Sequence, residues 1–339
     1  VAGALASNGF DTTVAGGVED AIVQLSVKPC DALVVDFSMP DADGIALVGE
    51  VRERFGSLPV VMLSGVATSE DQTRARDAGV DPSFIIGGDV VDLESGAAWG
   101  TGDFFVVEAD ESDGTFLELG HAVGIVTNVE PDHLEHYGGE AAMRAAFVEF
   151  AAAGDLAVVC ADDTGSMALA GGPGVVTYGL AESADYRMVD VERHRSGSSF
   201  ALVRGGVDLG RIEVSMPGLH NARNGAAATA TAIEMGLPIE AAQAALGRFG
   251  GVGRRFEPRG SARGIDFIDD YAHLPTEVSV AIDAAHDTGH DRVVAIFQPH
   301  RYSRTEALWR DFADSFDRAD LLIVTGIYSS GEAPRDGVT

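Results

Sequence analysis

The sequence contains very little lysine, cysteine or tryptophan. Its 339 residues include 2 cysteines and 2 tryptophans, and Lys28 is the single lysine among 23 basic residues. No apolar run reaches the roughly eighteen residues that a transmembrane helix needs, and no basic region precedes an apolar stretch as in a signal peptide. Cys30 and Cys160 form neither a close pair nor a metal-binding spacing, which favours a reducing, cytoplasmic location.

Positive charge is also scarce, and the formal net charge is −30. A strongly acidic surface repels phosphate-rich partners, so we expect neither nucleic-acid binding nor binding to an anionic membrane. A nucleotide phosphate would need a divalent cation or local arginines to approach this chain. Any mechanism that requires a lysine must use Lys28.

The chain has ample material for folded cores, since 46% of its residues are hydrophobic. Apolar strands alternate with amphipathic helices, which predicts the α/β class with several doubly wound, mainly parallel sheets. Examples are a buried strand at 156–160 and helices at 239–246 and 306–316. Residues 186–214 instead alternate apolar and polar around Gly205-Gly206, which predicts a small antiparallel sheet flanking the main one. We expect three regions, at residues 1–79, 80–252 and 253–339.

Residues 103–139 contain two short apolar runs, at 104–107 and 122–126, that have the pattern of buried, neighbouring parallel strands. The first leads into Glu108, and the second leads into Asn128 and His133. In open α/β sheets, ligands bind beyond the carboxyl ends of the strands. This arrangement predicts a metal–phosphate site, and the alternative is two solvated acidic loops.

A second group of polar residues precedes a strongly helical run at 226–234. His220, Asn221 and Asn224 lie near the amino-terminal end of that helix, where backbone dipoles favour anions and polar groups. The alternative is ordinary N-capping by Asn221, which explains one asparagine but not all three residues.

Two further strands of the third region end in charged or polar residues. The first, at 264–268, leads into Asp270 and His273, and the second, at 292–297, leads into Arg301 and Arg304. Arginines placed directly after a strand are suited to clamping a carboxylate or a phosphate. The alternative is surface ion pairing with the many local acids.

The first region resembles a response-regulator receiver domain. The matching features are Asp36 at a strand end, Met39-Pro40, Asp43-Gly44 and Ser64. The resemblance implies that Asp36 accepts a phosphoryl group, with a histidine kinase as the partner. The acidic pair of that family would precede Val1, and Lys28 precedes Asp36, so the family's later lysine is missing. We therefore expect a folded receiver fragment that cannot be phosphorylated.

The rest of the chain resembles the Mur ligases, the ATP-dependent ligases of peptidoglycan precursor synthesis. The resemblance rests on an ordered set of motifs: EADESD at 108–113, TNVEPDHLEHYGG at 127–139, PGLHNARN at 217–224, RRFE at 254–257, DDYAHLPTE at 269–277, FQPHRYSRT at 297–305 and YSSGEAP at 328–334. FQPHRYSRT is typical of the alanine-adding branch. The implied substrates are UDP-N-acetylmuramate and L-alanine, and the implied cofactors are ATP and Mg²⁺.

The resemblance also implies roles for individual residues. In the central domain, the implied metal ligands are Glu108 and His133, the implied contact to the nucleotide phosphates is Asn128, and the implied adenosine contacts are His220, Asn221 and Asn224. In the C-terminal domain, the residues that face the γ-phosphate and acyl phosphate are Arg255 and His273, those that shape the same site are Asp270 and Tyr271, and those that bind the amino acid are Arg301 and Arg304.

One Mur ligase motif is missing from its expected place. The family opens its central domain with a glycine-rich loop of GTHGKTT type, whose lysine reaches the nucleotide phosphates. Here the corresponding segment is 64–70, SGVATSE, without lysine. We therefore expect an inactive or impaired ligase that also lacks the family's UDP-binding domain and its last strands and helices. The alternatives are a receiver-regulated binding or signalling module and a non-functional fusion of two fragments.

Overall fold

The computed structural model describes residues 11–28, 30, 33–36, 51, 54–55, 60–63, 82–93, 95–100 and 104–338. The chain divides into two compact units, Val1–Asp89 with Leu93–Glu108, and Val90–Asp92 with Ala109–Thr339. None of the helices in the described ranges is both long enough and apolar enough to span a bilayer. Both cysteines are free, Cys30 exposed and Cys160 buried.

The first unit contains the helix α2 (Val18–Val27) and two small sheets. The strands β1 (Leu33–Asp36) and β2 (Val60–Leu63) are parallel, with Asp36 opposite Leu63, so Asp36 ends its strand as expected. The remaining receiver-like features lie outside the described residues: Met39, Pro40, Asp43, Gly44 and Ser64.

The second sheet of this unit has the order β4-β3-β5, formed by β3 (Ser83–Val90), β4 (Ser95–Ala98) and β5 (Phe105–Val107). β5 is therefore an edge strand, and its residues Phe105 and Val106 are 50% and 53% exposed. The expectation that this strand is buried beside the next one was wrong. The following strand, β6 (Val123–Val126), belongs to a different sheet, in the second unit.

The second unit is built on a six-stranded sheet of order β11-β10-β9-β8-β7-β6. Its elements, in chain order, are η1 (Thr115–Glu118), β6, α5 (Leu134–Tyr137), α6 (Glu140–Ala153), β7 (Leu156–Cys160), α7 (Thr164–Met167), β8 (Val175–Gly179), β9 (Tyr186–His194), β10 (Gly197–Arg204), β11 (Val207–Val214), α8 (Leu219–Glu234) and α9 (Ile239–Leu246). The strands β6, β7, β8 and β9 are mutually parallel. The α/β class is confirmed.

The antiparallel strands β9, β10 and β11 continue this sheet instead of forming a separate one, because β9 also pairs in parallel with β8. The predicted hairpin is confirmed at Gly205-Gly206, where both residues have positive φ, 56° and 82°. Two consecutive left-handed residues give the tight turn that matches the twist of the flanking strands.

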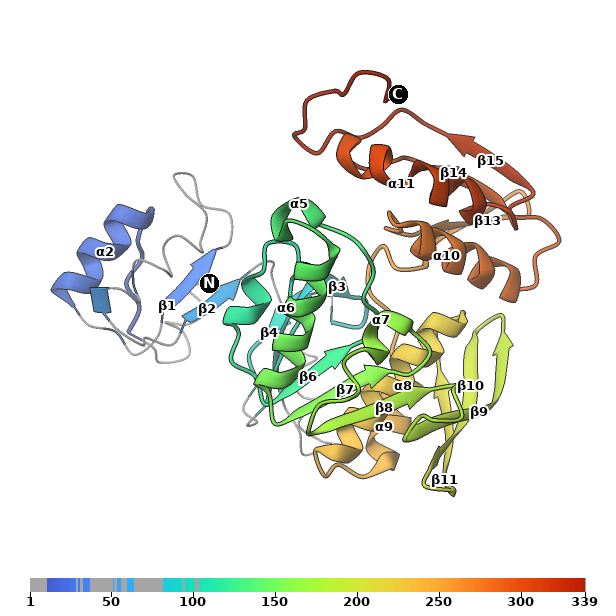
Figure 1. Cartoon of the computed structure of the whole chain (residues 1–339), viewed down its shortest axis with the longest axis horizontal. Coiled ribbons are helices and arrows are strands. Elements are labelled where there is room, and N and C mark those ends of the chain that lie inside the picture. Colours follow the sequence, from blue (N-terminus) through green and yellow to red (C-terminus); the bar gives the residue numbers. More distant parts are fainter. Residues whose placement is uncertain are drawn as a thin grey trace. The chain divides into compact units, whose positions relative to one another are not determined.

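Helices cover both faces of this sheet (Figure 1). Alternate residues of β7 point to opposite faces: Val158 packs in a cluster with Ala222 and Ala226 of α8, whereas Val159 packs with Met143 and Phe150 of α6. The small alanine side chains of α8 let its backbone approach the strands closely. Burial of these apolar groups is the main stabilising contribution to the sheet.

The last region of the second unit contains a two-stranded antiparallel sheet and a two-stranded parallel sheet. Its elements are β12 (Glu257–Ala262), β13 (Ile265–Asp269), α10 (Pro275–Asp287), β14 (Val294–Phe297), α11 (Tyr302–Ser315) and β15 (Leu321–Val324). The helices α10 and α11 pack on one face of β14–β15 through Val278, Ile282 and Phe312. α11 begins four residues earlier than its expected start at 306.

Candidate functional site

The loop that follows β6, residues 127–133, is held by the start of α7. The backbone N–H of Val129 donates to Asp163 Oδ1 at 3.0 Å, and the same oxygen accepts from Ser166 N at 2.7 Å as the N-cap of α7. Gly165 lies so close that a Cβ there would be 2.2 Å from the Val129 carbonyl oxygen. The loop is therefore fixed by one carboxylate and one glycine contact.

The polar side chains of this loop reach the C-terminal region. Asn128 Nδ2 donates to Glu130 Oε1 at 3.1 Å, and Thr276 Oγ1, in the first turn of α10, donates to Glu130 Oε2 at 2.7 Å. Asn128 is exposed. The side chain predicted to contact nucleotide phosphates is thus accessible and oriented by a neighbouring carboxylate.

His133 lies at the start of α5 in a left-handed conformation, with φ 51°. Its Nε2 lies 3.3 Å from Asp132 Oδ2, and its side chain is 13% exposed. Asp132 also pairs with Arg304 of α11, at 3.0 Å between Oδ2 and Nη2. Burial opposes ionisation of Asp132, but the hydrogen bond and charge of Arg304 outweigh it, so the pKa of Asp132 is lowered.

Glu108, the other expected metal ligand, belongs to the first compact unit, whereas His133 belongs to the second. Glu108 Oε2 accepts from the Gly87 backbone N–H at 2.6 Å, and a Cβ on Gly87 would lie 3.3 Å from that carboxylate. An exposed carboxylate at a strand end is a suitable ligand for a hard cation. In the described ranges, no three His, Cys, Asp or Glu residues gather into a metal-holding group.

The first turns of α8 contain the expected adenosine contacts. The helix begins at Leu219 after Gly218, whose φ is 99°, so Asn221 is not the N-cap and the capping alternative was wrong. The Asn221 side chain instead donates to the Pro217 carbonyl at 2.8 Å, and Asn224 is exposed. His220 Nδ1 is buried and makes no hydrogen bond in the described structure.

Burial also lowers the pKa of His220, and the charge of Arg223 adds to this effect. Arg223 Nε donates to Asp162 at 2.8 Å, and Asp162 further accepts from the backbone N–H groups of Leu180 and Ala181. The sequence interpretation missed Asp162 and Asp163 as positioning residues. Their signal was available, because both follow β7 directly, the position at which sheet ligand sites form.

Of the residues expected around the γ-phosphate, Asp270, Tyr271 and His273 lie between β13 and α10, whereas Arg255 precedes β12. The Asp270 carboxylate accepts two backbone N–H groups, from Phe256 and Ala272, each at 2.8 Å. Burial is the largest influence on this carboxyl and raises its pKa. Tyr271 is 40% exposed, and the Arg254 guanidinium lies 4.8 Å from its ring centroid.

His273 and Arg255 are both linked to Glu277, in the first turn of α10. Glu277 Oε2 accepts from the backbone N–H groups of His273 and Leu274, at 2.8 and 3.0 Å. His273 Nδ1 lies 2.9 Å from the Tyr271 carbonyl, and Arg255 Nη1 lies 3.9 Å from Glu277 Oε1. Glu277 therefore positions two predicted site residues, a role that the sequence interpretation did not assign.

The two expected amino-acid-binding arginines differ in their surroundings. Arg301 precedes α11 with φ 70°, and its Nε is buried without a hydrogen-bond partner in the described structure. Arg304, in the first turn of α11, is 8% exposed and pairs with Asp132. His300 stacks on Tyr328 with ring centroids 5.4 Å apart, and burial, followed by the Arg304 charge, lowers the His300 pKa.

One groove of the second unit borders the residues described above. Its volume is about 600 Å³, and it adjoins Arg255 and also includes Arg195, Met216, Phe256 and Asp266 in its wall. It lies beside the predicted site.

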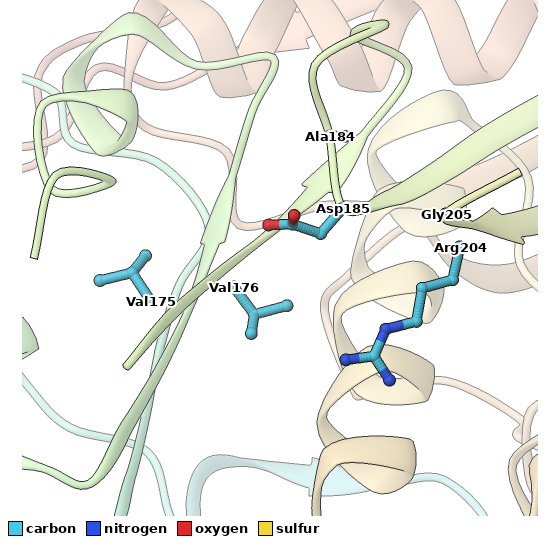
Figure 2. Close-up of a pocket in the computed structure, with 6 residues that line it drawn as sticks. All are labelled: Val175, Val176, Ala184, Asp185, Arg204 and Gly205. Carbon is cyan, nitrogen blue, oxygen red and sulfur yellow. The ribbon is translucent and has the colours of Figure 1, made fainter. Parts of the chain in front are cut away.

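A second cavity, of about 360 Å³, is lined by Asp185 and Arg204 among others, and Figure 2 shows both side chains at its wall. Arg204 pairs with Glu234, in the last turn of α8. The predicted adenosine contacts lie in the first turns of this helix, which spans 16 residues, or about 24 Å. The second cavity is therefore separate from the candidate site.

Comparison with known protein families assigns most of the chain. Residues 97–232 match the Mur ligase middle domain, and residues 254–338 match the Mur ligase, glutamate ligase domain. The chain carries the middle and C-terminal domains of a Mur ligase. Residues 1–85 match the response regulator receiver domain.

Individual relatives agree with this Mur ligase assignment. The chain is 45% identical over 280 residues to UDP-N-acetylmuramate–L-alanine ligase of Geobacter sp. strain M21, covering 80% of this chain and 60% of the relative. The enzyme of the same name from Salinibacter ruber is 42% identical, with 86% and 63% covered. The chain thus spans about three fifths of these curated relatives.

Solved structures show the same architecture. UDP-N-acetylmuramate-alanine ligase from Thermotoga maritima matches with a TM-score of 0.66 and 25% identity, over 97% of this chain and 77% of that one. A MurF structure from Acinetobacter baumannii matches with a TM-score of 0.58 and 18% identity, over 90% and 78% respectively, which supports the fold alone.

Proposed function

We propose that this Mur ligase chain carries a site for joining L-alanine to UDP-N-acetylmuramate with ATP and Mg²⁺. The names of its relatives indicate the amino acid and the sugar nucleotide. One observation carries the proposal. The loop after β6 meets the C-terminal domain through two contacts, Asp132 with Arg304 and Glu130 with Thr276. These contacts join the motif at 127–139 to the motifs at 269–277 and 297–305, which supports a site shared by the two domains.

In this proposal the nucleotide binds along the loops and helix ends of the central domain. Asn128 contacts its phosphates, and His220, Asn221 and Asn224 contact the adenosine at the start of α8. The exposed amide of Asn224 and the unpaired Nδ1 of His220 support these roles. Bound Mg²⁺, held by Glu108 and His133, would neutralise phosphate charge during phosphoryl transfer.

The C-terminal domain contributes the charge stabilisation. Arg255 and His273 face the transferring phosphoryl group and the acyl phosphate, where fixed positive charge and hydrogen-bond donors are most effective. Asp270 and Tyr271 shape this site, because Asp270 fixes the backbone of Phe256 and Ala272. Arg301 and Arg304 serve the incoming amino acid, in the roles argued below.

We also propose that turnover by this chain is strongly impaired. Its single lysine, Lys28, lies outside the matched Mur ligase domains, so those domains contain no lysine for the nucleotide phosphates. ADP release in the presence of ATP, UDP-N-acetylmuramate and L-alanine tests this. We expect rates far below the roughly 1–1,000 per second of typical enzymes. A turnover number within that range would contradict the proposal.

Nucleotide binding tests the site independently of turnover. We expect Asn224→Ala to weaken binding of a fluorescent Mg²⁺–ADP analogue about tenfold, the loss of one well-formed hydrogen bond in a buried complex. Gln243→Ala is the matched control, because it removes an amide that donates to the Arg211 carbonyl and has no proposed contact with the nucleotide. Equal affinity of Asn224→Ala and the unmodified chain would argue against the adenosine site.

A second candidate function is a receiver-controlled binding module, phosphorylated at Asp36 by a histidine kinase. The match of residues 1–85 and the position of Asp36 at the end of β1 favour it. Incubation with acetyl phosphate, followed by intact mass measurement, tests it against Asp36→Asn. An unmodified mass for the original chain would exclude this function. The cytoplasmic location, and the absence of membrane or nucleic-acid partners, remain predictions.

A further inference from the structure

Among the described residues, Arg304 is the least exposed charged side chain that forms an ion pair between the two Mur ligase domains. Its guanidinium Nη2 lies 3.0 Å from Asp132 Oδ2, and its Nε lies 3.5 Å from Asp132 Oδ1. Its Nη1 faces His300, at 3.3 Å from Nδ1 and 3.5 Å from the carbonyl oxygen. The three guanidinium nitrogens are therefore all directed at protein groups.

The burial of this pair distinguishes it from the other interdomain ion pairs. The side chains of Arg304 and Asp132 are 7% and 17% exposed. By contrast, Arg193 is 42% exposed and its partner Asp287 14%, and Arg195 is 70% exposed and its partner Asp266 30%, so neither arginine is enclosed as Arg304 is. Exposed pairs contribute little because water and salt screen them, whereas removing one partner of a buried pair leaves an uncompensated charge.

We propose that Asp132 and Arg304 form an interdomain clasp, and that Arg301 is the arginine that binds the carboxylate of the amino acid. The assignment of Arg301 rests on the proposed function, which names the amino acid. Asp132 is a positioning residue in this assignment. It holds the first turn of α11 against the loop after β6, and so places Arg301.

The contrast between the two arginines supports this division. Arg304 forms its bidentate contact with Asp132, the arrangement in which an arginine and a carboxylate bind most strongly. A substrate carboxylate would have to displace Asp132 from Arg304. Within the described residues, Arg301 forms no ion pair and its Nε has no hydrogen-bond partner, so a carboxylate that binds its guanidinium would displace no protein acid.

Asp132 also connects the clasp with the other proposed contacts of the loop. Its Oδ1 accepts from the His133 backbone N–H at 2.9 Å, and its Oδ2 lies 3.3 Å from His133 Nε2. One carboxylate therefore orients both His133 and Arg304. The clasp residue Asp132 thus links His133, a proposed metal ligand, with the first turn of α11.

Hydrogen exchange in the full chain tests the clasp without any ligand. The reporter is the backbone N–H of Thr305, which donates to the Arg301 carbonyl at 3.2 Å in the first turn of α11. We expect Asp132→Asn to speed its exchange about tenfold, which corresponds to about 1.4 kcal/mol. Arg304→Gln should act similarly, and the double variant should exceed neither single variant, because all three changes break one interaction.

The matched control is Arg195→Gln, which removes the more exposed of these two interdomain pairs and should leave Thr305 exchange unchanged. Arg304→Lys keeps the charge without the bidentate geometry, so its Thr305 exchange rate should lie between those of the original chain and Arg304→Gln. This milder variant keeps the test valid if the stronger variants misfold. Additive effects of Asp132→Asn and Arg304→Gln, or an unchanged exchange rate in Asp132→Asn, would overturn the clasp.

Titration with L-alanine, followed by nuclear magnetic resonance, tests the assignment of Arg301. We expect Arg301→Gln to weaken binding at least tenfold with unchanged Thr305 exchange, and Asp132→Asn to weaken binding and speed exchange together. If Arg304→Lys loses L-alanine as completely as Arg301→Gln while Thr305 stays protected, Arg304 contacts the ligand and the assignment is wrong. If the original chain does not bind L-alanine, the proposed substrate fails, and the exchange experiment still decides the clasp.

Discussion

The strand β7 of the central domain and the strand pair β14–β15 of the C-terminal domain have similar apolar sequences but differ in burial. In β7, Val158 and Val159 are both 0% exposed. In the C-terminal pair, Ile296 and Ile323 lie opposite each other and are 71% and 44% exposed. All of these residues belong to parallel strands, so strand type does not explain the difference.

The difference lies in what covers each sheet. β7 has a strand on either side and helices on both faces, because its alternate residues join the clusters formed with α8 and α6. β14–β15 is covered on one face by α10 and α11, and no described element buries the other. An apolar strand sequence thus indicates a strand, whereas its burial depends on distant parts of the chain.

The largest expected effect comes from truncating matched isoleucines in the two regions. Ile212→Ala, at a residue 0% exposed in β11, should lower the free energy of unfolding by about 2–5 kcal/mol, because it removes buried methyl groups and leaves a cavity. Ile296→Ala, at a residue 71% exposed, should change it by less than about 0.5 kcal/mol. Urea unfolding followed by circular dichroism measures both. Equal losses would mean that β14 is covered in solution.

A smaller effect is expected from adding a methyl group to matched glycines. Gly165→Ala would place Cβ 2.2 Å from the Val129 carbonyl oxygen, and relieving this clash should cost about 1–3 kcal/mol. Gly326, after β15, has no atom within 4 Å of the corresponding position, so Gly326→Ala should be neutral. Thermal unfolding of the two variants compares them. An unchanged midpoint for Gly165→Ala would show that the loop after β6 moves freely.

Local sequence signals were sufficient for much of the fold. The strand predicted at 156–160 and the helix predicted at 239–246 have the bounds that the structure shows for β7 and α9. The start of α11 was predicted four residues late, because a distant carboxylate stabilises it. Glu332 accepts from the Ser303 backbone N–H at 2.9 Å, from 29 residues away, and thus caps the first turn.

The candidate site was predictable in composition but not in its contacts. The motifs supplied Arg304 and the loop at 127–133, yet their connection joins residues 172 positions apart, Arg304 and Asp132. No periodicity or spacing rule reaches across that distance. The placement of β5 and β6 in separate sheets was missed for a similar reason, since two adjacent apolar runs do not specify which strands pair.

The smallest effect we predict is the change in the free energy of unfolding with pH. It tests whether the close packing of the central domain extends to the titratable side chain of His220. Burial lowers the pKa of His220 in the folded state, with Arg223 and then Arg255 adding to this effect and Asp287 opposing it. Below the ordinary histidine pKa of about 6.5, the unfolded chain therefore binds more protons than the folded chain. The stability contributed by neutral His220 is fully present above that pH and is lost as the pH falls towards the folded-state pKa.

The loss has an upper limit of about 1.4 kcal/mol per pH unit, the slope for a single proton. Urea unfolding between pH 5 and 8 should show it, and His220→Gln, which cannot titrate, should make the curve shallower below about pH 6.5. Comparison of the two proteins at pH 8, where both side chains are neutral, separates this effect from altered packing. Parallel curves for the two proteins at every pH would mean that water reaches His220, and that the start of α8 is as open as the outer face of β14–β15.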